Sequence, residues 1–130
     1  LFQSKEKGWD TLAYELGKWT PKEILGHIID TDRIMTFRAL CFSRGDQNSL
    51  PGFDQDPYVV NAGYAKVPTE LLLADFEAER KALATLLMTM DESVLDNVGN
   101  ANGNQISPRS LLWIIPGHFI HHINILKERY

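Results

Sequence analysis

Three histidines are spaced so that their imidazole rings could meet around one metal ion. His118 and His122 are four residues apart in an apolar segment, and such residues lie on one face of an α-helix. His27 belongs to a different segment, where it shares an apolar stripe with Ile24 and Ile34. Imidazole is a common ligand of zinc, nickel, copper and iron. Three such ligands without a fourth protein ligand are typical of a catalytic metal site.

A buried neutral imidazole needs a partner for each of its two ring nitrogens. One cation bound by all three rings would give each ring one of those partners, which favours a shared site. The alternative for each histidine is a hydrogen-bonded core residue, the commoner role of a single histidine on an apolar stripe. His121 is three residues from His118 and competes with His122, since both lie on apolar stripes. We favour His122 as the ligand and expect His121 to line the site behind the ligands.

The composition is that of a single globular domain spanning residues 1–130, with 44% apolar and 23% charged residues. A formal net charge of −4 and the lack of a long basic run argue against nucleic acid as a partner. No apolar run reaches the ~18 residues of a bilayer span. The single cysteine, Cys41, excludes an internal disulfide and favours a reducing, cytoplasmic location. No signal-peptide pattern is present, and we expect that natural sequence precedes Leu1.

Helix signals divide the rest of the chain into long helices and two loops. Residues 20–23 (Thr-Pro-Lys-Glu) form a complete helix start, and that helix should end near Gly45. Pro68 and the pair Ser107-Pro108 begin two further long helices. The remaining segments are predicted as a loop over 46–57, a helical turn over 58–64, a brief helix over 91–96 and a loop over 97–105.

Three helices of about 23 to 25 residues, each about 35 Å long, favour an all-α bundle. No segment alternates apolar and polar residues clearly enough to predict a sheet. We expect the fourth helix of the bundle to be a truncated remnant over residues 1–9. A shortened bundle exposes apolar surface, so we also expect a homodimer.

The chain resembles the DinB-like (YfiT-like) superfamily of metal-binding four-helix bundles over nearly its whole length from Trp19. The segment Trp-Thr-x-x-Glu-x-x-x-His at 19–27, combined with the closing histidine helix, is fairly specific, although neither motif is specific alone. The matching stretches are residues 17–27, 32–34, 38–40, 50–56, 102–104, 117–122 and 126–130.

The resemblance implies an up-down-down-up bundle with a long connection between its second and third helices. It implies a divalent metal, nickel or zinc, held by one histidine of the second helix and two of the last. These ligands correspond to His27, His118 and His122. The resemblance also implies a small-molecule substrate and, as in members that are transferases or isomerases, a low-molecular-weight thiol.

A metal held by three histidines would lower the pKa of a bound water towards ~7, or ionise a bound thiol. The ligands alone therefore permit hydrolysis and thiol transfer equally. Asp30 could orient a ligand ring or a bound water, although a solvent-facing acid is the commoner alternative. Arg33 and Arg38 could grip a substrate carboxylate. Their alternative role is an ion pair within the bundle, with Asp32, Asp54 or Asp56 as partner.

Several other residues could have either a structural or a functional role. We expect Trp19 and Trp113 to lie in the core rather than in a pocket, and Cys41 to be a core residue with a raised pKa. The loop over 51–56 could close over the metal, although such loops are more often simple connections.

Three functions remain open at this stage. The first is a metal-dependent S-transferase or hydrolase, and the second is a non-catalytic metal-binding dimer acting as a structural or stress-response module. The third, action on damaged DNA, is suggested only by the family's name and is opposed by the acidic charge.

Overall fold

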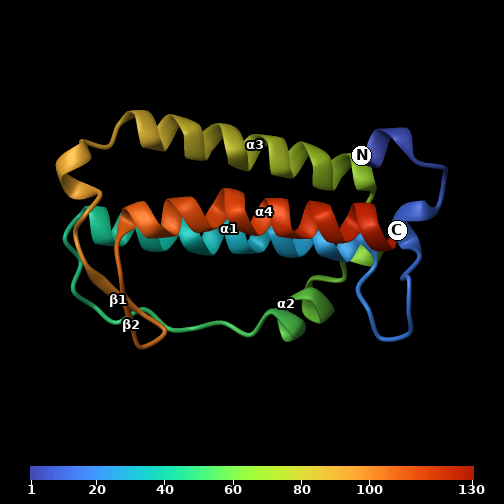
Figure 1. Ribbon diagram of the computed structural model, residues 1–130, viewed down its shortest axis with the longest axis horizontal. Helices are drawn as coiled ribbons and strands as arrows, with labels where there is room; N and C mark the ends of the chain where they lie inside the picture. Colours follow the sequence, from blue (N-terminus) through green and yellow to red (C-terminus); the bar gives the residue numbers. More distant parts are fainter.

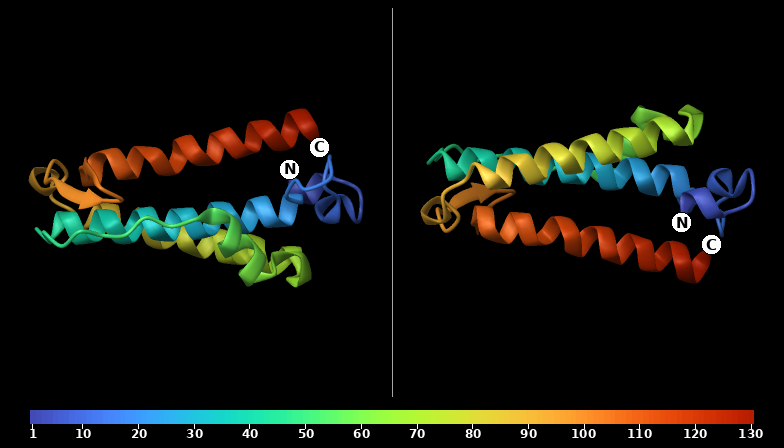
Figure 2. Two further views of the ribbon diagram at one scale, coloured as in Figure 1. Left: turned by 90° about the horizontal axis from the view of Figure 1, so that it is seen from below. Right: turned by 90° about the horizontal axis from the view of Figure 1, so that it is seen from above.

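The computed structural model describes the backbone of all 130 residues and every side chain except that of Gln3. The chain is mostly helical, which confirms the predicted all-α class. Helices α1 and α3 run in the same direction, and α4 runs antiparallel to both (Figure 1). Figure 2 shows α1 and α3 as one layer and α4 as a second layer. The helices are α1 (Pro21–Ser43), α2 (Gln55–Ala62), α3 (Thr69–Met88) and α4 (Pro108–Arg129).

Helix α1 begins where its capping signal predicts. The Thr20 hydroxyl accepts a hydrogen bond from the Glu23 backbone amide at 3.3 Å, and the Glu23 carboxylate accepts one from the Thr20 amide at 2.7 Å. Pro21 occupies the first helical position, where its missing N–H leaves no hydrogen bond unmade. After Ser43, Gly45 adopts a left-handed conformation with φ of 79°, which ends the helix.

Two adjacent apolar stripes on α1 make it the central helix of the bundle. Ile24 and Ile28 pack with Leu126 of α4, and a second stripe packs towards α3. A third cluster, at the far end of α1, covers the hairpin and the start of α4. The second stripe consists of Leu25 and Ile29, which pack with Leu72 of α3. The third cluster consists of Ala39, Phe42, Ala101 and Leu111. A ligand on α1 therefore has a fixed position relative to both neighbouring helices.

The prediction that residues 97–105 form only a loop is wrong. Two short antiparallel strands, β1 (Gly99–Ala101) and β2 (Asn104–Ile106), form a hairpin there. Asn102 and Gly103 make the two-residue turn with positive φ values of 54° and 76°, the conformation that an Asn-Gly pair favours. The strands are too short to show apolar alternation, so only the turn signalled the hairpin.

The N-terminal remnant predicted as a helix over residues 1–9 is not an α-helix. It forms two 3-10 turns, Phe2–Ser4 and Trp9–Thr11, and Gly8 between them has a left-handed φ of 91°. The segment packs at the end of α4, where the Trp9 indole donates a hydrogen bond to the Tyr130 carbonyl at 3.0 Å. Both chain ends consequently lie at the same end of the bundle (Figure 1).

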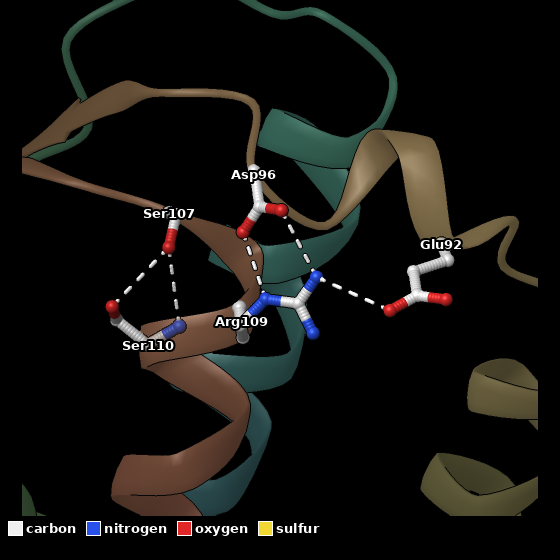
Figure 3. A network of polar contacts seen from close by, with 5 residues as sticks. All are labelled: Glu92, Asp96, Ser107, Arg109 and Ser110. Carbon is white, nitrogen blue, oxygen red and sulfur yellow. Dashed lines mark hydrogen bonds and ion pairs between the residues drawn. The ribbon is translucent and has the colours of Figure 1, made fainter.

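The start of α4 is joined by polar contacts to the segment that follows α3 (Figure 3). Arg109 forms a bidentate pair with Asp96 at 2.8 and 3.0 Å, and Glu92 lies 3.8 Å from the same guanidinium. Ser107 caps the helix by accepting a hydrogen bond from the Ser110 amide at 3.2 Å. Exposed ion pairs contribute little stability, but these contacts define where α4 begins and hence the position of its histidines.

Of the two tryptophans predicted to lie in the core, Trp19 packs against a core cluster and Trp113 does not. Trp19 is half-buried against the His27 ring, whereas Trp113 is 73% exposed and the prediction of a core position is wrong. Trp113 lies on the α4 face that borders a groove containing Leu87 of α3. The helical spacing places Trp113 on an apolar face of its helix, but it does not show which other helix covers that face. Cys41 packs partly buried against the core, and burial raises its thiol pKa as expected.

Two helical glycines provide a test of the packing. A Cβ added at Gly26 would lie 2.2 Å from a ring carbon of Tyr64, whereas one added at Gly117 would meet nothing within 4 Å. We predict that Gly26→Ala lowers the free energy of unfolding by about 1–3 kcal/mol through overpacking. Gly117→Ala, the matched control, should raise it by up to about 1 kcal/mol. Urea denaturation of both variants measures the difference, and equal stabilities would contradict the close contact at Gly26.

Candidate metal centre

Three histidine side chains meet between α1 and α4. Nε2 of His118 lies 2.9 Å from Nε2 of His27 and 3.0 Å from Nε2 of His122. All three ligand atoms fall within 4.8 Å of one another, and no other group of this kind occurs among the described side chains. His27 is 3% exposed, and the other two rings are partly buried. The structure therefore brings together the three residues that the sequence nominated.

Secondary structure explains how the rings converge. His118 and His122 are one turn apart on α4, and their ring centroids are 4.5 Å apart. His27 approaches from α1, where Ile24 and Ile28 on the neighbouring positions hold α1 against α4. Trp19, immediately before the α1 cap, packs on the outer side of His27 with ring centroids 4.9 Å apart. Apolar packing thus holds the His27 ring with its Nε2 facing Nε2 of His118.

The three rings cannot satisfy one another by hydrogen bonding. Nε2 of His118 faces two other Nε2 atoms but carries either one proton or one lone pair, so it cannot form a good hydrogen bond with each. Nδ1 of His118 and Nδ1 of His122 are also buried and have no protein partner. A single cation that accepts the three Nε2 lone pairs would resolve the conflict. The donor set therefore fits a divalent metal of the kind that binds imidazole.

The protein environment keeps the three rings neutral. Burial, followed by the neighbouring His118, lowers the pKa of His27 from 6.5 to about 4. Burial and the other histidines lower the pKa of His122 to about 3. The pKa of His118 is also lowered, by burial first and then by His121 and Arg80. A metal ligand must present a lone pair, so these rings are ready to bind a cation at neutral pH.

A charged cluster from α1 and α3 lies beside the metal centre. Arg80 Nε is 2.8 Å from a carboxylate oxygen of Asp32, which is fully buried. The guanidinium packs over the rings of Phe76 and Phe119, at 5.0 and 5.1 Å from their centroids. Burial raises the pKa of Asp32 to about 7 despite the opposing charge of Arg80. The sequence does not single out Arg80 as a residue near the site, since a charged residue on a helix is usually exposed.

An open cleft of about 270 Å³ reaches the metal centre at His122. His122 forms part of its wall, together with residues from the segment before α1, the start of α2 and the end of α4. Gln55 and Asp56 line the cleft, so the end of the loop over 51–56 does reach the histidines' side of the bundle. The other lining residues are Tyr14, Gly17, Lys18, Trp19, Ile24, Ile125 and Tyr130.

The expected supporting residues of the site, His121 and Asp30, differ in how close they lie to the ligand rings. His121 is exposed, and its ring packs edge-on against His122 without a hydrogen bond to it. Asp30 is half-buried and lies near Tyr64, whose pKa is raised by burial first and then by Asp30. No hydrogen bond joins Asp30 to a ring of the cluster among the described side chains.

The two arginines considered for substrate binding are not part of the histidine cluster. Arg33 pairs with Asp75 of α3 at 2.6 Å, so the ion-pair reading fits, but its partner differs from the predicted Asp32, Asp54 or Asp56. Arg38 has no acidic partner and donates a hydrogen bond to the Pro51 carbonyl at 2.7 Å. The spacing on α1 does not reveal which helix or loop covers each arginine.

A sequence profile of the DinB superfamily matches residues 10–126. The chain belongs to the DinB superfamily. No curated protein matches this DinB-superfamily chain. Among solved structures it is similar to YfiT from Bacillus subtilis, described as a probable metal-dependent hydrolase with an unusual four-helix bundle topology. The TM-score is 0.75 at 17% identity, with 98% of this chain and 75% of YfiT covered. The likeness confirms the predicted four-helix-bundle fold for this member of the superfamily.

The lowered histidine pKa values predict how stability depends on pH in the metal-free protein. Between pH 6.5 and about 4, the unfolded chain protonates His27 and the folded protein does not. The free energy of unfolding should therefore fall as pH drops through this range, by roughly 2 kcal/mol for His27. His122, whose pKa is lowered to about 3, adds a loss of similar size. Asp32, with its raised pKa, acts in the opposite direction and offsets part of the combined loss.

Urea denaturation at several pH values in the presence of a chelator measures this dependence. His27→Phe provides the comparison, because it has no imidazole to protonate at this position and keeps Asp32. Its stability should fall less steeply between pH 6.5 and 4 than that of the wild type. Parallel curves for the two proteins would show that His27 is not held neutral by burial.

Proposed function

We propose that this protein is a metal-dependent hydrolase acting on a small molecule, with His27, His118 and His122 as the metal ligands. The convergence of three Nε2 atoms, with His122 on the wall of an open cleft, carries this proposal. Catalytic metal sites use three protein ligands and leave another position for water or substrate. The donor set and the family resemblance both suit nickel or zinc. The description of YfiT as a probable metal-dependent hydrolase supports the same reaction class.

A divalent cation in this site would act as a Lewis acid and bring the pKa of a coordinated water or thiol towards neutrality. The chain's own contribution is to hold three neutral imidazoles with their Nε2 atoms at a common point. Trp19 and Ile24 give the cleft apolar walls, while Gln55, Asp56 and Lys18 give it polar groups at its margin. Such a cleft suits a small substrate that has both apolar and polar parts.

Thiol transfer is the alternative reaction for the same site. The three imidazoles are uncharged, so a bound divalent ion would retain its full charge and would stabilise a thiolate as well as hydroxide. The family resemblance supports a low-molecular-weight thiol as co-substrate. A non-catalytic metal-binding homodimer is the second alternative, and a fourth protein ligand would favour it. Among the described side chains, none of the groups able to ligate a metal joins the three histidines.

Metal content tests the ligand assignment. Protein purified without a histidine tag should contain about one divalent ion per chain, because one set of three donors is present. His27→Ala and His122→Ala should each lose most of the metal. His121→Ala is the matched control, since this histidine lies on the same helix but is exposed and outside the cluster. Inductively coupled plasma mass spectrometry gives the stoichiometry. Metal retained by His27→Ala, or lost by His121→Ala, would contradict the assignment.

The reaction class requires a separate assay. We expect the metal-loaded protein to hydrolyse an activated aryl ester, with a rate that falls at least about 100-fold in His122→Ala and on chelation. The same protein is tested for the reaction of cysteine-containing thiols with an electrophilic aryl halide, in which the thiolate sulfur displaces halide and forms an aryl thioether. Thiol consumption without ester hydrolysis would replace the hydrolase by the S-transferase. Full metal loading with neither reaction would favour the non-catalytic module.

A further inference from the structure

Arg38 of α1 is a buried cation without a counter-ion. It is 7% exposed, and no carboxylate lies within ion-pair distance of it among the described side chains. Burial alone lowers the pKa of its guanidinium. Buried charges in proteins are normally paired, since an unpaired one loses its hydration without compensation. This environment contrasts with that of Arg33, which has Asp75 as its partner.

The protein uses only part of the hydrogen-bonding capacity of this guanidinium. One terminal nitrogen donates to the Pro51 carbonyl at 2.7 Å, and the other lies 4.0 Å from the sulfur of Met35. A guanidinium has five N–H donors in a planar fork that matches a carboxylate. The ring of Phe53, 5.9 Å from the guanidinium carbon, offers a favourable aromatic face but no negative charge.

A small pocket lies against Arg38, with a volume of about 170 Å³. Its walls include the rings of Phe37, Phe53 and Tyr58, and the last two rings are 5.4 Å apart. Phe37 and Tyr58 are 56% and 46% exposed, so the aromatic walls are open to solvent. Arg38 is the one charged residue in the lining. The pocket therefore combines flat apolar walls with a single cationic fork.

The wall opposite α1 does not depend on Arg38 for its position. The Leu50 amide donates to the Asn100 carbonyl, and the Asn102 amide donates to the Leu50 carbonyl, both at 2.9 Å. The next part of the loop packs tightly, because a Cβ added at Gly52 would lie 2.2 Å from the Asn102 side chain. These contacts with the hairpin hold the loop already. A role as loop clasp therefore does not explain why a charged residue is buried here.

We propose that the pocket formed by Arg38, Phe37, Phe53 and Tyr58 binds a small carboxylate whose apolar part is flat or aromatic. The guanidinium fork would take the carboxylate oxygens, and the rings would contact the apolar part. Phosphate fits less well, because it needs several donors and the rest of the lining is apolar. Arg38 is eleven residues after His27 on one helix, a separation of roughly 16 Å. The site is thus distinct from the metal centre and does not rest on the proposed hydrolase function.

Benzoate is a suitable probe, with benzamide as its neutral counterpart. Both are titrated at constant ionic strength into chelator-treated protein, so that the carboxylate cannot bind through the metal. We expect benzoate to cause saturable NMR shifts of the Phe37, Phe53 and Tyr58 ring signals with a Kd on the order of 1 mM, and benzamide to cause none. Arg38→Met should abolish the shifts. Arg38→Lys, which keeps the charge but not the fork, should weaken binding by roughly tenfold.

Two matched variants separate this site from the rest of the molecule. Arg33→Met removes the paired arginine five residues earlier on α1 and should leave benzoate binding unchanged. His27→Ala should also bind benzoate normally, even if it loses every property of the metal centre. The proposal is overturned if no ring signals saturate, if benzamide binds equally, or if the shifts centre on the histidines. Unchanged binding by folded Arg38→Met or Arg38→Lys would overturn it as well.

Discussion

The structure depends on one constraint: three imidazoles meet at the same point between α1 and α4 and cannot all serve as hydrogen-bond partners for one another. Nε2 of His118 meets two equivalent atoms, and each imidazole nitrogen has either a proton or a lone pair to offer. An unsatisfied buried polar atom reduces stability by about 1–3 kcal/mol. A cluster of such atoms is therefore expensive for a small domain to keep unless a ligand compensates it. The geometry favours a cation over a hydrogen-bond network for this reason.

The bundle positions the cluster through α1, which packs against both other long helices. The Ile24 and Ile28 stripe sets the distance from α1 to α4, and the adjacent stripe of Leu25 and Ile29 sets its distance from α3. The capping box at Thr20 fixes where α1 begins, and the Arg109 contacts fix where α4 begins. A shift of either helix by one residue would rotate a histidine by about 100° away from the common point.

Sequence alone predicted the features that depend on local chemistry. The capping motif at Thr20, the proline starts and the one-turn spacing of His118 and His122 are local, and the structure contains all of them. The hairpin was missed because three-residue strands show no periodicity, although Asn102-Gly103 is a strong turn signal. Trp113 and Arg80 were misjudged or overlooked because their surroundings come from other helices. Helical spacing gives a face, and tertiary packing decides whether that face is covered.

Arg80 lies close to His118, and the carboxylates beside it offset its positive charge. A guanidinium close enough to lower the pKa of His118 would also repel a divalent cation bound there. Asp32 contacts this guanidinium at 2.8 Å and Glu79 lies near both, so carboxylate charge stands beside the positive charge. The raised pKa of Asp32 describes the cluster with neutral histidines; a nearby dication would favour its ionised form. Metal binding between α1 and α4 would in this way strengthen the ion pair that joins α1 to α3.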